Sequence, residues 1–397
     1  HLHAHGATMR EGPRPNRALL AVLVPLLALT LVGLLLLWPN ADRAASRVDL
    51  DFGSELVDGT VERVRRDDCA ATAPGSGVQC QVAEVRLEEG PDEGDVFDLE
   101  IQESPTSVDL DDGDRIVLNR VTAEEVPEDL RYTFADYQRT TPLIVLAVLF
   151  VLAVVTLGRF QGIRSLVGLT VSLLVLLRFV LPSILDGNDA VAVALVGSAL
   201  IMLAALYLAH GFNERTTIAV LGTFASLLLT GLLAVVFVGV TQITGLADED
   251  ARILTVAAQQ IDVRGLLLGG IIIGALGVLD DVTVTQVSAV AEIHRADPRL
   301  TFRDLYGRAL RIGRDHIAST VNTLVLAYAG ASLPLLVLFV QAERGLGDVL
   351  TGETVAAELV RTLVGSIGLV ASVPITTALA AFAASRGLSE GDVTAAA

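Results

Sequence analysis

The stretch from Gly269 to Ser288 has the sequence GGIIIGALGVLDDVTVTQVS and decides the class of fold. It is long and apolar enough to cross the hydrocarbon core of a bilayer, which takes about 20 residues. Two adjacent carboxylates, Asp280 and Asp281, lie within that run. Ionisable groups are rare in membrane helices and usually face a protein interior or a water-filled cavity. The stretch therefore indicates a membrane protein with a polar site inside the bilayer.

Seven further apolar runs of similar length occur in the chain, so we expect eight transmembrane helices. The first run follows Arg17 and is longer than the apolar core of a signal peptide, which predicts a retained signal anchor (18–38). The other seven form a predicted transmembrane domain (142–385), and the two ends (1–17 and 386–397) are predicted to be cytoplasmic tails. The eight predicted spans are Ala18–Leu37, Pro142–Leu157, Leu166–Leu181, Val191–His210, Ile218–Val240, Leu266–Ala291, Ile317–Val340 and Leu359–Ala383.

An acidic region, 40–141, separates the first span from the others. It holds 26 acidic residues and 10 arginines of a chain whose formal net charge is −18. Nucleic-acid binding is excluded, because proteins of that class carry a basic surface. The region consists of short alternating runs separated by turn residues, which predicts a small β-barrel or sandwich. The predicted strands are Leu56–Val64, Gln79–Leu87, Val96–Gln102 and Arg115–Val121.

Both cysteines of the chain, Cys69 and Cys80, lie in this acidic region. A zinc site normally needs four ligands at close spacing, and no histidine lies near the pair. If the region faces an oxidising compartment, a disulfide is expected. Two free thiols are the alternative.

The distribution of arginine predicts the orientation in the cell membrane. Arginines between the spans gather on one side of the predicted topology, and the short loops of the other side hold only Arg252, Arg264 and Arg344. Because cytoplasmic loops are enriched in Lys and Arg, we expect both termini in the cytoplasm and the acidic domain outside. The segment Arg295–Arg314 interleaves arginines with apolar residues at helical spacing. It predicts a cationic helix on the inner leaflet, or a signal that only determines topology.

Helical spacing places the small and polar residues of the opening stretch on one face. The outer half of that face is glycine, which predicts close helix packing, and the inner half is polar. Neighbouring carboxylates in a bilayer need water, a compensating cation or a bound proton. A break at Leu279–Asp281 is a further hypothesis, because aspartate favours helix N-caps and several transporters build ion sites from half-helices. The face consists of Gly270, Gly274, Gly277, Asp281, Thr285 and Ser288.

The next span also begins with polar residues. His316 and Thr323 share a helical face, and Asn322 lies on an adjoining one. We take Glu292 and His316 as the inner ends of two antiparallel spans. Asp281 then lies about 16 Å into the membrane and Asn322 about 9 Å, at about 1.5 Å per residue. These depths predict one polar pocket in the cytoplasmic half of the bilayer. An incidental interfacial histidine, and hydroxyls bonded to their own backbone, are the structural alternatives.

Three strings carry a family resemblance: LYLAHGFNERTT (Leu206–Thr217), LGVLDDVTVTQ (Leu276–Gln286) and GRDHIASTVNTLVLAYAGASLPLLVLF (Gly313–Phe339). Through them the chain resembles, over roughly Leu130 to Arg386, the YibE/F-like family of bacterial multi-spanning membrane proteins. The resemblance implies an integral membrane protein whose β domain is the usual N-terminal extension of the single-chain form. It implies no particular substrate or activity.

We expect a transporter or permease-like protein that moves a small solute or ion through a polar site between the sixth and seventh spans. The alternative is a membrane scaffold or sensor whose acidic domain binds a partner or a cation. An enzyme is not expected, because adjacent carboxylates project about 100° apart on a helix and cannot flank one water. No cofactor is predicted, the bilayer is the expected partner, and a homo-oligomer is left open. The candidate substrate- or ion-binding residues are Asp280, Asp281, Thr285, Ser288, His316, Asn322 and Thr323.

Overall fold

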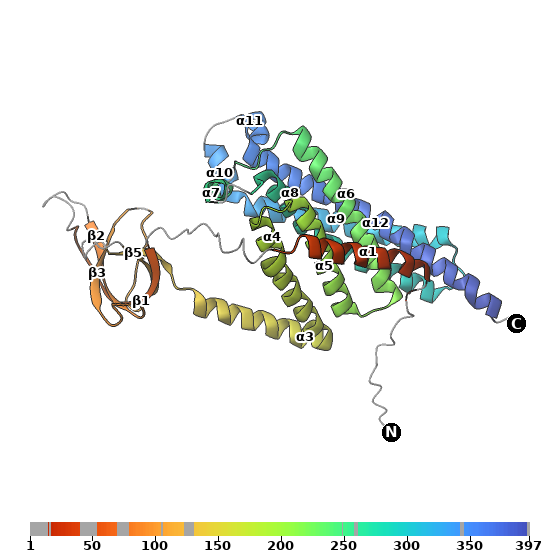
Figure 1. The fold of residues 1–397 in the computed structure, drawn as a ribbon, viewed down its shortest axis with the longest axis horizontal. Helices are drawn as coiled ribbons and strands as arrows, with labels where there is room; N and C mark the ends of the chain where they lie inside the picture. Colours follow the sequence, from red (N-terminus) through yellow and green to blue (C-terminus); the bar gives the residue numbers. More distant parts are fainter. Residues whose placement is uncertain are drawn as a thin grey trace, which may run out of the picture. The chain divides into compact units, whose positions relative to one another are not determined.

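The computed structural model describes residues 15, 17–39, 54–69, 79–104, 106–122, 131–247, 249–257, 261–341 and 345–394 (Figure 1). Most of the predicted N-terminal tail lies outside these residues. The chain divides into two compact units. One unit is Val48–Thr156, which contains the sheet, and the other combines His1–Arg47 with Leu157–Ala397 and contains most of the helices.

The β unit is built on one antiparallel sheet with the strand order β3-β2-β1-β4-β5. Three predicted strands are found with their predicted bounds, and the first is longer than predicted. Strand β5 was not predicted, because its six residues alternate between apolar and polar over too short a run to be recognised. The strands are β1 (Ser54–Asp68), β2 (Gln79–Leu87), β3 (Val96–Gln102), β4 (Arg115–Val121) and β5 (Tyr132–Tyr137).

The sheet curls, and its two edge strands approach each other. The rings of Phe97 on β3 and Tyr132 on β5 lie with their centroids 4.9 Å apart. A bulge between Val61 and Arg63 bends the long strand β1, as bulges do when they increase local twist. The apolar faces therefore enclose one core, as a barrel does, and the described residues do not form a two-sheet sandwich. Its buried residues are Val57, Val61, Ala83, Val85, Leu87, Leu99, Leu110, Ile116, Leu118 and Tyr132.

Six helices of the described chain are long and apolar enough to cross a membrane. Two of the eight predicted spans, Pro142–Leu157 and Leu166–Leu181, fall in one of these segments. The predicted span Ile317–Val340 is not among the six, because the chain divides it at Ser332 between two helices. The six segments are Arg17–Leu36, Thr140–Leu185, Ala190–His210, Glu214–Val240, Val263–Ala296 and Glu353–Ser385.

The segment from Thr140 to Leu185 contains one non-helical residue. Arg159 has φ 50° and ψ −133°, so the chain kinks sharply at a position where a loop between two spans was predicted. The segment ends in a π-helical turn and a short α-helix. Its parts are α3 (Thr140–Val175), η2 (Leu176–Val180) and α4 (Leu181–Leu185).

The centre of the helical unit is formed by three long helices, α6, α8 and α12, which pack against one another (Figure 1). Helix α5 packs on α8, and α9 packs on α12 and α8. The helices of this unit are α1 (Arg17–Leu36), α5 (Ala190–His210), α6 (Glu214–Val240), α7 (Glu249–Ala257), α8 (Val263–Ala296), α9 (Phe302–Ala331), α10 (Leu333–Gln341), α11 (Leu346–Thr351) and α12 (Glu353–Thr394).

Helix α8 contains the opening stretch of sequence and is continuous. The hypothesis of a break at Leu279–Asp281 is wrong, since the helix begins after its N-cap Asp262 and ends at Ala296 without interruption. Aspartate and β-branched residues have low intrinsic helix propensity. Packing of α6 and α12 along the helix outweighs that preference, because most helical stability in proteins comes from tertiary contacts.

Helix α9 joins the arginine-rich segment to the span that follows it. It begins in a capping box, in which the side chains of Thr301 and Asp304 each bond the backbone of the other. Leu305, Ala309 and Gly313 are buried, at the helical spacing of i, i+4 and i+8. Residues 302–314 of the cationic segment therefore form the first half of a packed helix, and the second half enters the predicted span.

Candidate functional site

Asp280 and Asp281 point in different directions from α8, as adjacent helical residues must. Asp280 faces α6, where its carboxyl group lies against Thr223. One oxygen of this group, Oδ1, is buried and has no hydrogen-bond partner among the described residues. A buried polar atom without a partner is costly in an apolar environment. Other buried polar atoms of the helical unit also lack a partner, Arg361 Nε and Gln286 Nε2 among them, but within the described residues Asp280 Oδ1 is the only carboxyl oxygen of this kind.

Two threonine hydroxyls complete the surroundings of Asp280. The Oγ1 atoms of Thr223 on α6 and Thr283 on α8 lie 2.6 Å apart, and both side chains are fully buried. Thr283 is also within hydrogen-bonding distance of the backbone oxygen of Asp280, at 3.1 Å. One carboxylate and two hydroxyls thus form an oxygen-rich cluster between α6 and α8. Oxygen ligands of this kind suit hard cations.

Asp281 faces α9 and meets His316 there. Asp281 Oδ2 lies 3.9 Å from His316 Nε2, and 72% of the Asp281 side chain is exposed. The structure thus brings together two candidate residues that are 35 positions apart. It corrects the predicted alignment of the two spans, because His316 lies beside Asp281 rather than beside Glu292. Along the two antiparallel helices, Asn322 consequently lies further than Asp281 from the loop that joins them, the reverse of the predicted order.

The remaining candidates do not close a pocket around this pair. Thr285 is half-buried, whereas Ser288, Asn322 and Thr323 are exposed. The Thr323 hydroxyl bonds the backbone oxygen of Ser319, one turn earlier in its own helix. Such a bond within one helix is the structural role that was the alternative to ligand binding for this hydroxyl.

The glycines predicted to pack against a neighbouring helix are mostly uncovered. A Cβ atom built on Gly270 or Gly277 meets nothing within 4 Å, and one built on Gly274 meets only the Tyr328 hydroxyl, at 3.6 Å. Within the described chain no neighbouring helix packs against Gly270 or Gly277, so the packing predicted there stays a prediction. Close packing uses Gly269 instead, because its Cβ position lies 3.2 Å from the backbone oxygen of Ala190 on α5.

A buried amide on α8 was missed as a candidate. Gln286 is fully buried, and its Oε1 accepts a hydrogen bond of 3.0 Å from the Thr377 hydroxyl of α12. Its Nε2 has no partner in the part of the chain that the structure describes, and neither has the hydroxyl of the neighbouring Thr376. The sequence does contain a signal for Gln286, because an amide inside an apolar span usually forms a hydrogen bond with another helix.

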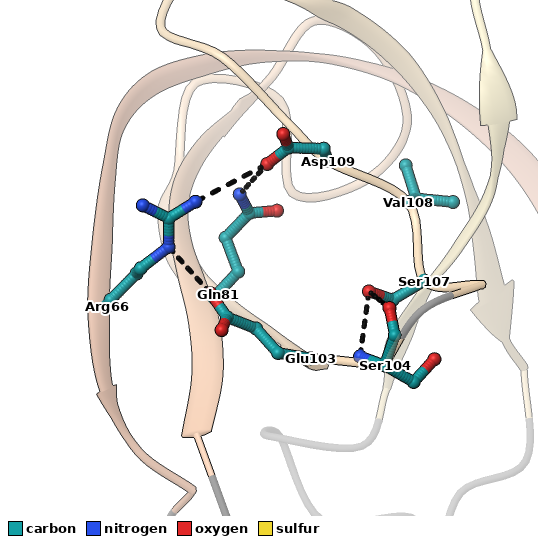
Figure 2. A pocket seen from close by; sticks show the side chains of 7 residues that line it. All are labelled: Arg66, Gln81, Glu103, Ser104, Ser107, Val108 and Asp109. Carbon is teal, nitrogen blue, oxygen red and sulfur yellow. Dashed lines mark hydrogen bonds and ion pairs between the residues drawn. The ribbon is translucent and has the colours of Figure 1, made fainter.

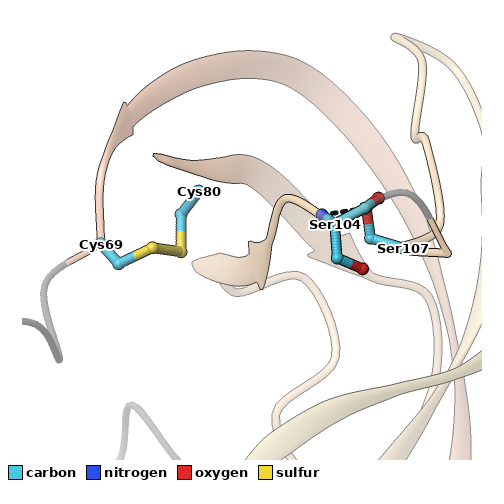
Figure 3. Close-up of a disulfide and its surroundings, with 4 residues drawn as sticks. All are labelled: Cys69, Cys80, Ser104 and Ser107. Carbon is cyan, nitrogen blue, oxygen red and sulfur yellow. Dashed lines mark hydrogen bonds between the residues drawn. A yellow bond between two sulfur atoms is a disulfide. The ribbon is translucent and has the colours of Figure 1, made fainter. Parts of the chain in front are cut away.

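The β unit carries a separate pocket of about 430 Å³ beside its disulfide (Figures 2 and 3). Arg66 Nε bonds Glu103 at 2.6 Å, and the same guanidinium lies 3.8 Å from Asp109, so one cation faces two carboxylates. Gln81 also bonds Asp109, at 2.8 Å. The lining residues are Arg66, Gln81, Glu103, Ser104, Ser107, Val108 and Asp109.

The predicted disulfide between Cys69 and Cys80 is confirmed. Cys80 directly precedes Gln81 in β2, so the bridge lies next to the pocket, with Ser104 and Ser107 close by (Figure 3). Within the described residues, no three His, Cys, Asp or Glu side chains gather as a metal site would require.

Several long apolar helices around a buried polar cluster define a multi-pass membrane protein of the helical class. A family profile described as YibE/F-like protein matches residues 146–386, and the chain belongs to this family. The match includes all three strings that carried the resemblance. Comparison with curated proteins and with solved structures finds no match.

Proposed function

We propose that the protein is a transporter or permease-like protein of a bacterial cell membrane. It moves a small solute or ion past a polar site on α8, with both termini in the cytoplasm and the β unit outside. The observation that carries this proposal is the oxygen cluster of Asp280, Thr223 and Thr283. A structural helix gains nothing from a buried carboxyl oxygen that lacks a partner, whereas a binding site keeps such an atom free for its ligand.

The path past this cluster uses the other carboxylate. Asp281 directly follows Asp280 on α8, and His316 lies opposite Asp281 on α9. A carboxylate and an imidazole within 4 Å attract and release cations or protons. Asp280 then acts as the binding group, and Asp281 with His316 supplies the polar approach from the cytoplasmic side.

The test measures flux in proteoliposomes with imposed gradients of Na⁺, K⁺ and H⁺, each followed by an entrapped dye. Asp280→Asn is expected to abolish flux of at least one of these ions, and Asp281→Asn to reduce it. Asp315→Asn is the matched control, because Asp315 is an exposed carboxylate on α9 outside the cluster. Equal flux in wild type and Asp280→Asn would overturn the proposal.

A second function, a membrane sensor, is favoured by the pocket of the β unit. Its two carboxylates, Glu103 and Asp109, are balanced by the single guanidinium of Arg66. We expect Arg66→Gln to strengthen Ca²⁺ binding to the full-length protein in calorimetry, because it leaves both carboxylates uncompensated. Asp109→Asn in the same background should remove the gain. Unchanged Ca²⁺ binding in Arg66→Gln would remove the support for cation sensing.

A further inference from the structure

Asp280 lies between packed helices, and no positive charge faces it in the described chain. On α9, His316 is paired with Asp281, and the neighbouring Arg314 and Asp315 are exposed. On α5, α6 and α12 the charged residues lie toward the helix ends. They are His210 on α5, Glu214 and Arg215 on α6 and, on α12, residues up to Arg361 and from Arg386 onward. A carboxylate at position 280 would therefore be a buried charge without compensation, which is costly.

The two threonine hydroxyls beside Asp280 have one hydrogen each to donate. Thr283 donates its hydrogen to the backbone oxygen of Asp280, at 3.1 Å, as threonines in helices commonly do. The hydrogen of the 2.6 Å bond between the two hydroxyls then comes from Thr223. Thr223 Oγ1 is therefore able to accept a further hydrogen bond and has no hydrogen left to donate.

The carboxyl group of Asp280 lies against this hydroxyl of Thr223. A carboxylate only accepts hydrogen bonds, whereas a carboxylic acid also donates one. The acid form therefore completes a hydrogen bond with Thr223, and the charged form does not. The unpartnered Oδ1 fits the acid form as well, because a buried oxygen without a partner costs less on a neutral group than on a charged one.

The same cluster suits a metal ion poorly. Ca²⁺ and Mg²⁺ take about six or more oxygen ligands, and the cluster offers one carboxyl group and two hydroxyls. The hydroxyls bond each other at 2.6 Å instead of spreading around an ion. Helices α6 and α8 are continuous, so their backbone oxygens remain in helical hydrogen bonds. A proton needs only one oxygen of the carboxyl group.

We propose that Asp280 is a proton-binding site and that the ion handled by this site is H⁺ rather than a metal ion. The bound proton lies on the Asp280 carboxyl group and is donated in a hydrogen bond to Thr223 Oγ1. On release the carboxylate keeps the electron pair, and the proton passes to water. The proposal rests on the proposed function only for the movement of the proton across the membrane, since binding is measured without flux.

Infrared spectroscopy of the full-length protein in nanodiscs tests proton binding. The difference between wild type and Asp280→Asn at neutral pH is expected to contain the C=O stretch of a protonated carboxylic acid, which shifts in D₂O. Asp281→Asn is the matched control and should keep this band, because the Asp281 side chain is 72% exposed and faces His316. If Asp280→Asn removes no acid band from the wild-type spectrum, the proposal is overturned.

Thr283→Val provides a readout that a purely structural role would not produce. It removes the acceptor of the Thr223 hydrogen, which then becomes available to Asp280 and favours the carboxylate. The acid band at neutral pH should therefore weaken in Thr283→Val. Thr285→Val is the control, since that hydroxyl on the same helix is outside the pair. An acid band of the same strength in Thr283→Val and wild type would contradict the hydrogen-bond arrangement that carries the proposal.

Flux measurements distinguish this proposal from the proposed function. In proteoliposomes, an imposed pH gradient should drive H⁺ flux that Asp280→Asn abolishes, while gradients of Na⁺ and K⁺ drive none. Flux of Na⁺ or K⁺ that requires Asp280, without H⁺ flux, would overturn the proton site and leave transport supported. An acid band assigned to Asp280 in a protein that moves none of the three ions would support the proton site and count against transport.

Discussion

Thr230 of α6 occupies the space that a side chain at position 368 of α12 would need, so a Cβ atom on Gly368 would collide with the Thr230 hydroxyl. The relationship recurs with reversed roles, because a Cβ atom on Gly222 of α6 would collide with Thr376 of α12. The two contacts are eight residues apart on each helix. Glycine facing threonine thus fixes both the distance and the register of α6 against α12, as small residues do in membrane bundles.

The first prediction concerns this contact. Gly368→Ala should lower the free energy of unfolding in detergent by about 1 to 3 kcal/mol, the usual effect of overpacking. Thr230→Ala in the same chain should restore part of the loss, because it removes the hydroxyl. Gly270→Ala is the control and should not destabilise, since its Cβ meets open space. Equal stability of Gly368→Ala and Gly270→Ala would mean that the helices are further apart than the structure has them.

The buried amide gives a second prediction. The Thr377 hydroxyl contacts both Gln286 Oε1, at 3.0 Å, and the backbone oxygen of Val373, at 2.6 Å. Thr377→Val leaves the buried Gln286 oxygen without its donor and should lower stability by about 1 to 2 kcal/mol. Thr323→Val is the control, because that hydroxyl is exposed and bonds only its own helix. Equal losses in the two variants, measured by thermal unfolding, would argue against the interhelical bond.

Asp280 is expected to lower the stability of the folded protein while it supports ion flux. Its buried, unpartnered oxygen disfavours the folded state, so we expect Asp280→Asn to keep or raise the unfolding temperature while ion flux is lost. Asp281→Asn should leave the unfolding temperature unchanged, since that side chain is mostly exposed. If Asp280→Asn lowered the unfolding temperature, the carboxylate would be a structural group, and loss of flux in this variant would no longer support a binding role.

A pH-dependent prediction applies to the strands of the β unit, which are not part of the candidate membrane helices. Hydrogen bonds from the Thr60 hydroxyl and the Arg115 guanidinium hold the pKa of Glu88 below its usual value. A lowered folded-state pKa adds stability at neutral pH, and that stability is lost as the pH falls through the folded-state pKa. Thr60→Val should therefore weaken amide-exchange protection of β1 and β2 at neutral pH.

The difference between this variant and wild type should shrink at an acid pH below the folded-state pKa of Glu88, where that group is protonated in both proteins. Thr133→Val is the control, because its hydroxyl makes only a long contact of 3.5 Å with the Asn119 backbone. A difference between Thr60→Val and wild type that is the same at both pH values would show that the Glu88 charge is not its cause.

Much of the fold could be predicted because its signals are local. Strands β2, β3 and β4 alternate at period two between turn residues, and α8 and α12 are long apolar runs. The disulfide followed from two cysteines in one small region. The kink at Arg159 and the division between α9 and α10 at Ser332 could not be predicted. Both depend on backbone angles that the neighbouring residues do not dictate.

The sequence by itself determined which polar and small residues the long helices carry: two carboxylates, a histidine, an amide and a line of glycines. Only the tertiary structure decided which of them meet. It placed Asp280 against Thr223, Asp281 against His316 and Gln286 against Thr377, and it left Gly270 and Gly277 uncovered. The reason is geometric. Helical periodicity defines a residue's direction about its own axis, whereas the register and rotation of each helix against its neighbours depend on side chains far apart in the chain.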